Sequence, residues 1–266
     1  MKDNFIAQSF GKSQNYTDIP NQLYKEYNVK KGLRNEDGTG VRVGLTRVSD
    51  VVGYDLVDGV KTNVAGRLYY RGYDIVDIAA ARAKDAVGYE EVMFLLLFGF
   101  LPSKREFDNF NDILRDMYAL PNDFLEMNLL RMPAQNLMNK LQHAVLTLYN
   151  YDEDPDNVEV YSTLLKGLDI TAKLPSIMCY AYQSKMHYFN RESLVIHYPM
   201  KKYSIAENIL YMLRENRQFS AKEASLLDTI LVLQADHGGG NNSTFANVVV
   251  SSTGTDIYSS IAAAIG

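Results

Sequence analysis

The chain has 266 residues, of which 47% are hydrophobic and 22% charged, and its formal net charge is −5. This composition is that of a folded globular protein and excludes a wholly disordered chain. The mild negative charge provides no electrostatic attraction for nucleic acid or for an anionic membrane, so neither is expected as a partner.

Cysteine content and the N-terminal residues indicate the setting of the protein. The single cysteine, Cys179, lies in the apolar run "SIMCYAY" and is predicted to be a small buried side chain. The first residues, "MKDNFIAQSFGKSQ", lack the apolar stretch of a signal peptide, and no run reaches the ~18 apolar residues of a membrane span. We therefore expect a cytoplasmic location.

Two turn signals lie in the polar first part of the chain, "NEDGTG" at 35–40 and "VDGV" at 57–60. The runs "VRVGLTRVS" (41–49) and "NVAGRLYYRG" (63–72) flank the second turn. Both have the composition of strands, which predicts that they pair as a short β-hairpin.

From about residue 74 the hydrophobic period changes to that of helices. The run "YEEVMFLLLFG" predicts an apolar helix that stops at Gly99. The next helix begins with Ser103 and Glu106, whose spacing is that of a capping box. Its apolar side chains recur at helical spacing and predict a stripe that faces the core: Phe107, Phe110, Leu114 and Met117.

Further helices are predicted in "AQNLMNKLQHAVLTLYN", "VYSTLLKGLDITAKLPSIMCYAYQSK" and "IAENILYMLREN", and a last one starts near Asp256. Because helix follows helix with almost no strand, the predicted class is all-α. We expect an N-terminal arm over 1–40 and helical domain over 41–266. A second capping box also opens a helix with a buried stripe: the box is Ser220 and Glu223, and the stripe includes Leu227, Ile230 and Leu231.

Most polar motifs in the chain do not predict chemistry. The acidic run "DEDPDN" (152–157) spaces its aspartates like the start of a calcium loop. Asn157 stands where that loop needs glycine, and Thr163 stands where it needs the bidentate glutamate, so a solvated acidic turn is expected. No metal site is predicted. Three isolated histidines are expected to be structural or on the surface: His143, His187 and His197.

The stretch "ADHGGGNNSTF" (235–245) differs in kind. It makes a poor phosphate loop, because a helix precedes it and no G-K-[ST] follows. The helix from Ser220 is expected to run to about Asp236 or His237 and to exit through the glycines. A mobile turn is one interpretation. The favoured one is a site for a small polar ligand, because a histidine at a helix C-terminus is held protonated and can donate to a carboxylate or keto oxygen.

Several segments together resemble the citrate synthase family: "GRLYYRGYDIVDIA", "YEEVMFLLLFGFLPSKREFDNF", "DITAKLPSIMCYAY", "YSIAENILYML" and "LVLQADHGGGNNSTFANVVVSSTGTDIYSSIAAAIG". The resemblance covers about residues 30–266 in the family's order. It implies a helical large domain of citrate synthase type with a short N-terminal hairpin, and the family's small domain would be absent from these residues. The domain over 41–266 would then be part of that large domain.

The resemblance implies a function and a site. The reaction would be the condensation of acetyl-CoA with oxaloacetate to citrate and CoA in the tricarboxylic acid cycle, with acetyl-CoA as substrate and no cofactor. His237 would hydrogen-bond oxaloacetate and Asn241 would be a nearby contact. Gln234 stands where relatives often carry a second histidine, and it could support the site together with Gly239 and Gly240.

The catalytic groups of the family are not found in residues 1–266. We would expect them downstream of Gly266: the G-P-x-H-G-G turn, a further histidine, the arginines and the catalytic aspartate. Residues 1–266 alone are therefore predicted to be inactive. The resemblance also implies a homodimer through large-domain helices. The alternatives are a 2-methylcitrate synthase, and a non-catalytic dimerisation or binding module with the same fold.

Overall fold

The computed structural model describes residues 20–27, 30, 46–58, 60–82, 88–236, 238 and 241–266. The chain divides into two units, Met1–Arg42 and Val43–Gly266. In the first unit the described element is the short helix α2 (Asn21–Glu26). The sheet, the remaining described helices and the core belong to the second unit.

The second unit is mainly helical, which confirms the predicted all-α class with a short hairpin at its start. Every predicted helix is present, and the long one that contains Cys179 extends to Asn190. In chain order the described helices are α3 (Ile75–Arg82), α4 (Gly88–Phe98), α5 (Lys104–Asp116), the π-helix η1 (Leu125–Leu130), α6 (Leu137–Leu148), the 3-10 turn η2 (Tyr149–Tyr151), α7 (Val160–Asn190), α8 (Ile205–Leu213), α9 (Ala221–Leu233), α10 (Asn242–Ser251) and α11 (Ile257–Ile265).

The described strands form an antiparallel sheet in the order β1 (Ser49–Val57), β2 (Val60–Tyr70) and β3 (Tyr73–Asp74). The hairpin turn lies where "VDGV" predicts it. Asp58 there has a φ of 53°, which suits the tight two-residue turns that Asp-Gly favours.

The first strand of the hairpin is not the one predicted. Residues 41–45 of the predicted strand lie outside the described residues, and of residues 46–49 only Ser49 belongs to β1. The reason is the short turn, which places Val57 directly opposite Val60. The residues immediately before the turn must then pair with β2, so the strand lies after residue 48.

The N-terminal ends of three helices are set by local hydrogen bonds. In each, a serine hydroxyl accepts a hydrogen bond from the backbone N–H three residues later, and a glutamate there accepts one from the backbone N–H of the serine. Both predicted capping boxes are therefore confirmed, and a third was not predicted. The predicted pairs are Ser103–Glu106 and Ser220–Glu223, and the third is Ser204–Glu207.

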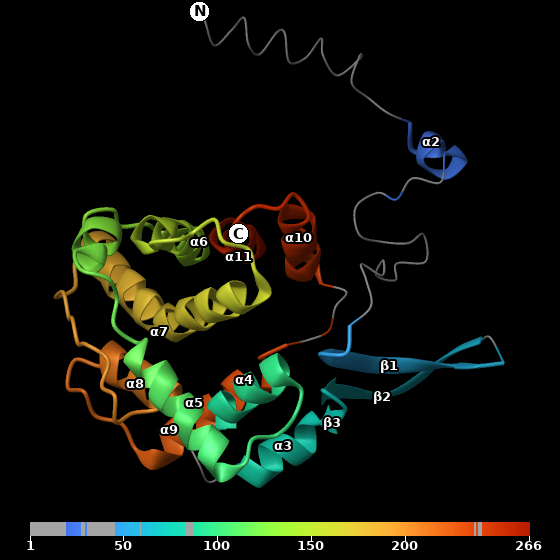
Figure 1. The fold of residues 1–266 in the computed structure, drawn as a ribbon, viewed down its shortest axis with the longest axis horizontal. Coiled ribbons are helices and arrows are strands. Elements are labelled where there is room, and N and C mark those ends of the chain that lie inside the picture. Colours follow the sequence, from blue (N-terminus) through green and yellow to red (C-terminus); the bar gives the residue numbers. More distant parts are fainter. Residues whose placement is uncertain are drawn as a thin grey trace, which may run out of the picture. The chain divides into compact units, whose positions relative to one another are not determined.

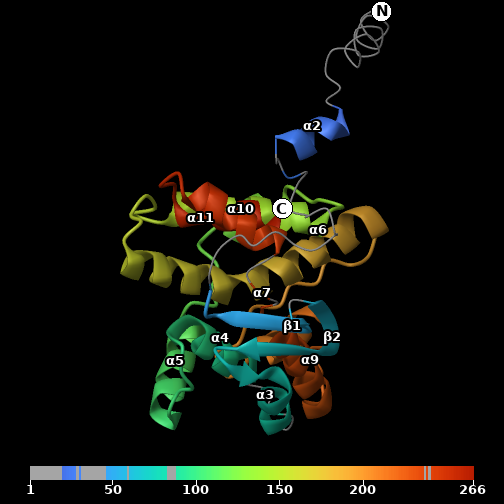
Figure 2. The ribbon, with the colours of Figure 1, turned by 90° about the vertical axis from the view of Figure 1, so that its right-hand side faces the viewer.

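Helix α7 lies at the centre of the second unit. Figures 1 and 2 show it between α6, α10 and α11 on one side and α4, α5 and α9 on the other. Its sequence explains this place, because buried positions occur on more than one face and Cys179, Tyr180 and Ala181 are buried in succession. The prediction that Cys179 is buried is confirmed.

Predicted core positions are confirmed only in part. Phe110 and Leu114 of the α5 stripe are buried in the main core. On α9, Leu227 and Leu231 pack against that core, but Ile230 is 43% exposed, so its predicted burial is wrong. The face that α9 buries most deeply carries Ala224, Asp228 and Val232, because α9 packs against both α4 and α8.

Two buried carboxylates cap neighbouring helices inside this core. Asp228 of α9 accepts hydrogen bonds from the backbone N–H groups of Gly88 and Tyr89, at the start of α4. Glu90 of α4 in turn accepts one from the N–H of Ile205, at the start of α8. These bonds use N–H groups that have no partner within their own helices and hold α4, α8 and α9 together.

Candidate functional site

Helix α9 ends earlier than predicted, and the cause is a tyrosine from the sheet. The predicted end was Asp236 or His237, whereas the helix ends at Leu233. The Tyr70 hydroxyl accepts a hydrogen bond from the Asp236 N–H at 3.1 Å and lies 3.0 Å from the carbonyl oxygen of Val232. In a continuing helix these two backbone groups would bond to each other. The phenol therefore takes the place of the next helical bond and stops the helix.

Tyr70 is held firmly enough to fix this helix end. It is fully buried, and it packs with Ile75, Val92, Leu95 and Val232 in a second, smaller core between the hairpin and helices α3, α4 and α9. Burial raises the pKa of its phenol, so the hydroxyl remains a protonated donor. Its oxygen also lies 3.0 Å from the carbonyl oxygen of Asp236.

The next fixed point is Gly238. Its backbone N–H donates to the Asp236 carboxylate at 2.9 Å. Its φ is 96°, and a Cβ there would lie 3.3 Å from Cγ2 of Val51. The left-handed conformation favours glycine at this position, and a Cβ would also press closely on Val51 of β1. At Gly238 the bare backbone is therefore explained by packing against the sheet.

Asn241 begins helix α10. Its Oδ1 accepts a hydrogen bond from the Thr244 N–H at 2.7 Å, which is an N-cap, and its Nδ2 donates to the Gly238 carbonyl at 2.8 Å. Asn241 thus joins Gly238, in the middle of the connection between α9 and α10, to the first turn of α10. One N–H and one lone pair of its amide remain for a ligand. Helix α10 was not predicted from its residues, since its N-cap lacks the glutamate that would complete a capping box.

Of the other predicted site residues, only Gln234 lies among the described residues. Gln234 is the C-cap of α9 and its side chain is exposed. Gln234 and Asn241 lie at the two ends of the segment 234–241. His237, Gly239 and Gly240 lie outside the described residues.

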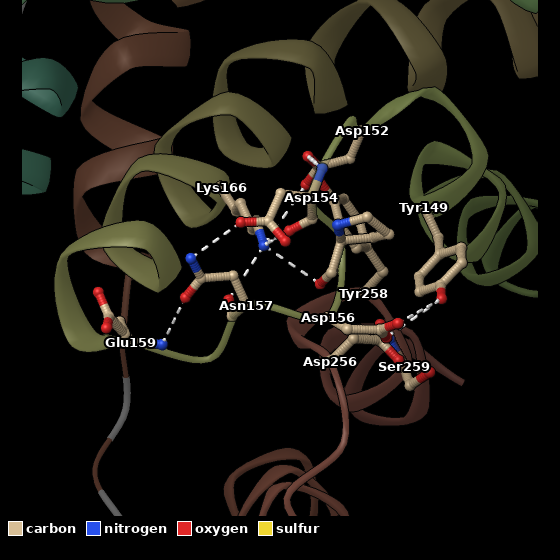
Figure 3. Close-up of polar contacts among 11 residues, drawn as sticks. Tyr149, Asp152, Asp154, Asp156, Asn157, Glu159, Lys166, Asp256, Tyr258 and Ser259 are labelled. Atoms are coloured by element: carbon tan, nitrogen blue, oxygen red, sulfur yellow. Dashed lines mark hydrogen bonds and ion pairs between the residues drawn. The ribbon is translucent and has the colours of Figure 1, made fainter.

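The acidic run 152–157 is organised around a buried lysine (Figure 3). The Lys166 ammonium donates to three backbone carbonyl groups of the run and lies 3.6 Å from the Asp152 carboxylate. Carbonyl and carboxylate oxygens are the ligands that calcium prefers, and here the side chain of α7 supplies the positive charge. The carbonyl groups are those of Asp154, Pro155 and Asn157.

Carboxylates of the same run also bind tyrosine hydroxyl groups, one of them from α11. The Tyr258 hydroxyl donates to Oδ2 of Asp152 at 2.7 Å, and the Tyr149 hydroxyl lies 3.1 Å from both carboxylate oxygens of Asp156 (Figure 3). The turn thus connects α7 and α11 with the C-terminal end of α6 through side-chain contacts. It was predicted only as a solvated turn, because Lys166 is distant in sequence from the aspartates.

The remaining histidines make local contacts. Nδ1 of His187 lies 2.8 Å from the Glu192 carbonyl oxygen. His197 accepts a hydrogen bond from Arg217 at Nδ1, so its Nε2–H donates to the Glu215 carbonyl at 3.1 Å. Burial and the nearby Lys140 charge lower the pKa of His143.

Two other kinds of feature are absent from the described part of the chain. No group of histidine, cysteine or carboxylate side chains there could hold a metal ion. No helix of the same residues is both long and apolar enough to cross a membrane.

The hairpin, the helix pair α4–α5, the long α7 and the α9–α10 connection together define a fold class found in solved citrate synthases. The structure of citrate synthase from Pyrobaculum aerophilum superposes with a TM-score of 0.66 and 30% identity, over 88% of this chain and 56% of that one. Citrate synthase from Haloferax volcanii is 38% identical over 242 residues, 90% of this chain and 56% of that protein.

Two further findings bear on the family. The profile described as "Citrate synthase, C-terminal domain" matches residues 35–266. A 2-methylcitrate synthase from Mycobacterium tuberculosis is 32% identical over 243 residues, 90% of this chain and 53% of that protein. The chain belongs to the citrate synthase family. It spans about half the length of these curated relatives.

Proposed function

We propose that the segment 234–241 is one wall of a pocket for oxaloacetate, the acceptor of a citrate synthase reaction. The observation that carries the proposal is the frame around His237, since Tyr70 fixes the end of α9 and Asn241 fixes the start of α10. Because α9 ends at Leu233, His237 lies beyond its last turn, and its proposed role rests on the imidazole N–H as a hydrogen-bond donor and not on the helix dipole. The N-terminal end of α10 presents backbone N–H groups to an anion. A short polar segment that leads into such a helix start suits a dicarboxylate.

Each residue of the segment has a proposed role. His237 donates a hydrogen bond to the keto or a carboxylate oxygen of oxaloacetate, which polarises the carbonyl that is attacked. Asn241 offers its remaining amide N–H. Gly239 and Gly240 leave room for the ligand to approach the backbone, and Gln234 supports the segment from the end of α9.

The proposed reaction is a Claisen condensation. A carboxylate base removes a methyl proton from acetyl-CoA, and the resulting enol carbon attacks the keto carbon of oxaloacetate, after which hydrolysis of the thioester releases citrate and CoA. Residues 41–266, as part of the large domain, would supply the acceptor wall. We place the base, the enol-stabilising histidine and the carboxylate-binding arginines in the part of the family's length that residues 1–266 do not span.

A polypeptide of these 266 residues is therefore expected to bind oxaloacetate without turning it over. The test is release of free thiol from acetyl-CoA in the presence of oxaloacetate, compared with the same assay without protein. Sustained thiol release that depends on both substrates would contradict this division of roles.

A 2-methylcitrate synthase is the second candidate, because a relative of that name matches 90% of the chain at 32% identity. Acyl preference would be decided by the half of the family's length that binds the acyl-CoA. Comparing acetyl-CoA with propionyl-CoA in an active protein that contains these residues distinguishes the two. A kcat/KM that favours propionyl-CoA would assign the second activity.

We further propose a homodimer through α6 and α7 and a cytoplasmic location. Both helices expose apolar side chains, with Met138 and Leu146 on α6 and Met178 and Tyr182 on α7. We propose that these side chains belong to the dimer interface, where exposed apolar surface becomes buried. Light scattering tests the dimer, and a monomer at micromolar concentration would contradict it. A dimer that binds no oxaloacetate would instead support the non-catalytic module.

A further inference from the structure

One buried hydroxyl next to the segment 234–241 has no hydrogen-bond partner. Ser49, the first residue of β1, is 7% exposed, and its Oγ is buried without a partner. Buried polar groups are nearly always hydrogen-bonded, and leaving one unpaired destabilises the fold. In the sequence, Ser49 is the last residue of the predicted strand 41–49, and no role in a site is predicted for it.

The strand register shows which way this hydroxyl points. Ser49 pairs with Tyr70, and Val51 pairs with Leu68, across the two antiparallel strands. Residues that face each other across a strand pair, and residues two apart along a strand, have side chains on the same face of a sheet. Ser49, Val51 and Tyr70 therefore share one face.

Two contacts show what this face covers. The Tyr70 hydroxyl bonds the backbone of Asp236, and Cγ2 of Val51 is the nearest atom to a Cβ built on Gly238. Ser49 therefore lies beside both side chains, on the face of the sheet that covers the connection between α9 and α10. Strand β1 thus places the Ser49 hydroxyl on the same face of the sheet as the two side chains that contact the segment 234–241.

We propose that Ser49 is a further oxaloacetate-binding residue, whose hydroxyl donates a hydrogen bond to an oxygen of the bound acceptor. The inference rests on the proposed function of the segment 234–241. Its physical basis is that a donor without a partner in the ligand-free chain gains one when a keto-dicarboxylate, which carries only acceptor oxygens, binds beside it. The hydroxyl then contributes to affinity and not to the stability of the free protein.

The test is a pair of measurements on the 266-residue chain and its Ser49→Ala variant. The dissociation constant for oxaloacetate is obtained by NMR titration, at an ionic strength held constant with sodium chloride. Loss of a hydrogen bond to a charged acceptor predicts a Kd raised roughly tenfold or more. The midpoint of thermal unfolding without ligand is expected to be unchanged or higher, because the variant removes an unpaired polar group.

Matched variants complete the design. Ser184→Ala removes a buried serine hydroxyl that does have a partner, the Leu129 carbonyl at 2.9 Å, so it should lower the unfolding midpoint and leave the Kd unchanged. Ser49→Thr keeps a hydroxyl and should retain affinity within about twofold.

Three results would overturn the inference. An unchanged Kd in Ser49→Ala, with binding by the parent chain intact, refutes the role of Ser49 and leaves the proposed function standing. A lower unfolding midpoint for Ser49→Ala would show that the hydroxyl is already paired in the free chain. Absence of oxaloacetate binding by the parent chain refutes the proposed function, and the inference fails with it.

Discussion

The hydroxyl of Tyr70 is expected to stabilise the chain by closing the end of α9. The Tyr70→Phe variant keeps the buried ring and removes only the oxygen, which leaves the Asp236 N–H without its partner, while the Val232 carbonyl keeps the hydrogen bond from the Ala235 N–H. Leaving a backbone N–H unpaired away from water costs about 1–3 kcal/mol. For a domain of this size that corresponds to a fall of roughly 2–10 °C in the unfolding midpoint.

The assay is thermal and urea unfolding of the parent chain and the variant, with Tyr73→Phe as the matched control. Tyr73 is 43% exposed, so its variant should change the free energy of unfolding by less than about 0.5 kcal/mol. Hydrogen exchange at the Asp236 amide should also become faster in Tyr70→Phe alone. If the two variants are equally stable, the hydroxyl does not determine where α9 ends.

Three further predictions concern buried groups. Burial raises the pKa of Glu90 to about 7. The free energy of unfolding of the parent chain should therefore fall by up to about 3 kcal/mol relative to Glu90→Gln as pH rises from 4.5 to 7. Urea unfolding at pH 5 and pH 8 checks this, and a difference that does not depend on pH would contradict it. Lys166→Met should cost about 3–5 kcal/mol in the same assay, because three carbonyl groups and Asp152 lose their cation; parent-like stability would contradict that account. Burial also raises the pKa of Cys179 to about 12, so a thiol reagent should modify the unfolded chain only, and rapid labelling of the folded chain would disprove the burial.

Local signals predicted local structure well. The Ser103 and Ser220 capping boxes and the Asp-Gly turn depend on residues within four positions of each other, and all three are present. The π-helix η1 and the third capping box were not predicted, although Ser204 and Glu207 have the spacing of the other two boxes.

Features that depend on residues distant in sequence were missed. The end of α9 is set by Tyr70, which is 166 positions before Asp236. The acidic turn is organised by Lys166, which lies on the following helix, α7. The exposure of Ile230 is decided by the helices against which α9 packs. Of the candidate site, Gln234 and Asn241 flank the predicted segment, whereas Tyr70 and Ser49 reach it only through the sheet.

Mapping oxaloacetate binding by NMR on the isotopically labelled 266-residue chain tests the central proposal most directly. We predict that titration shifts the amide resonances of 234–241 and of neighbouring Tyr70 and Val51, and that His237→Ala abolishes these shifts while the rest of the spectrum stays folded. Absence of any shift at millimolar oxaloacetate, or shifts that persist in His237→Ala, would contradict the proposal that this segment is the acceptor wall.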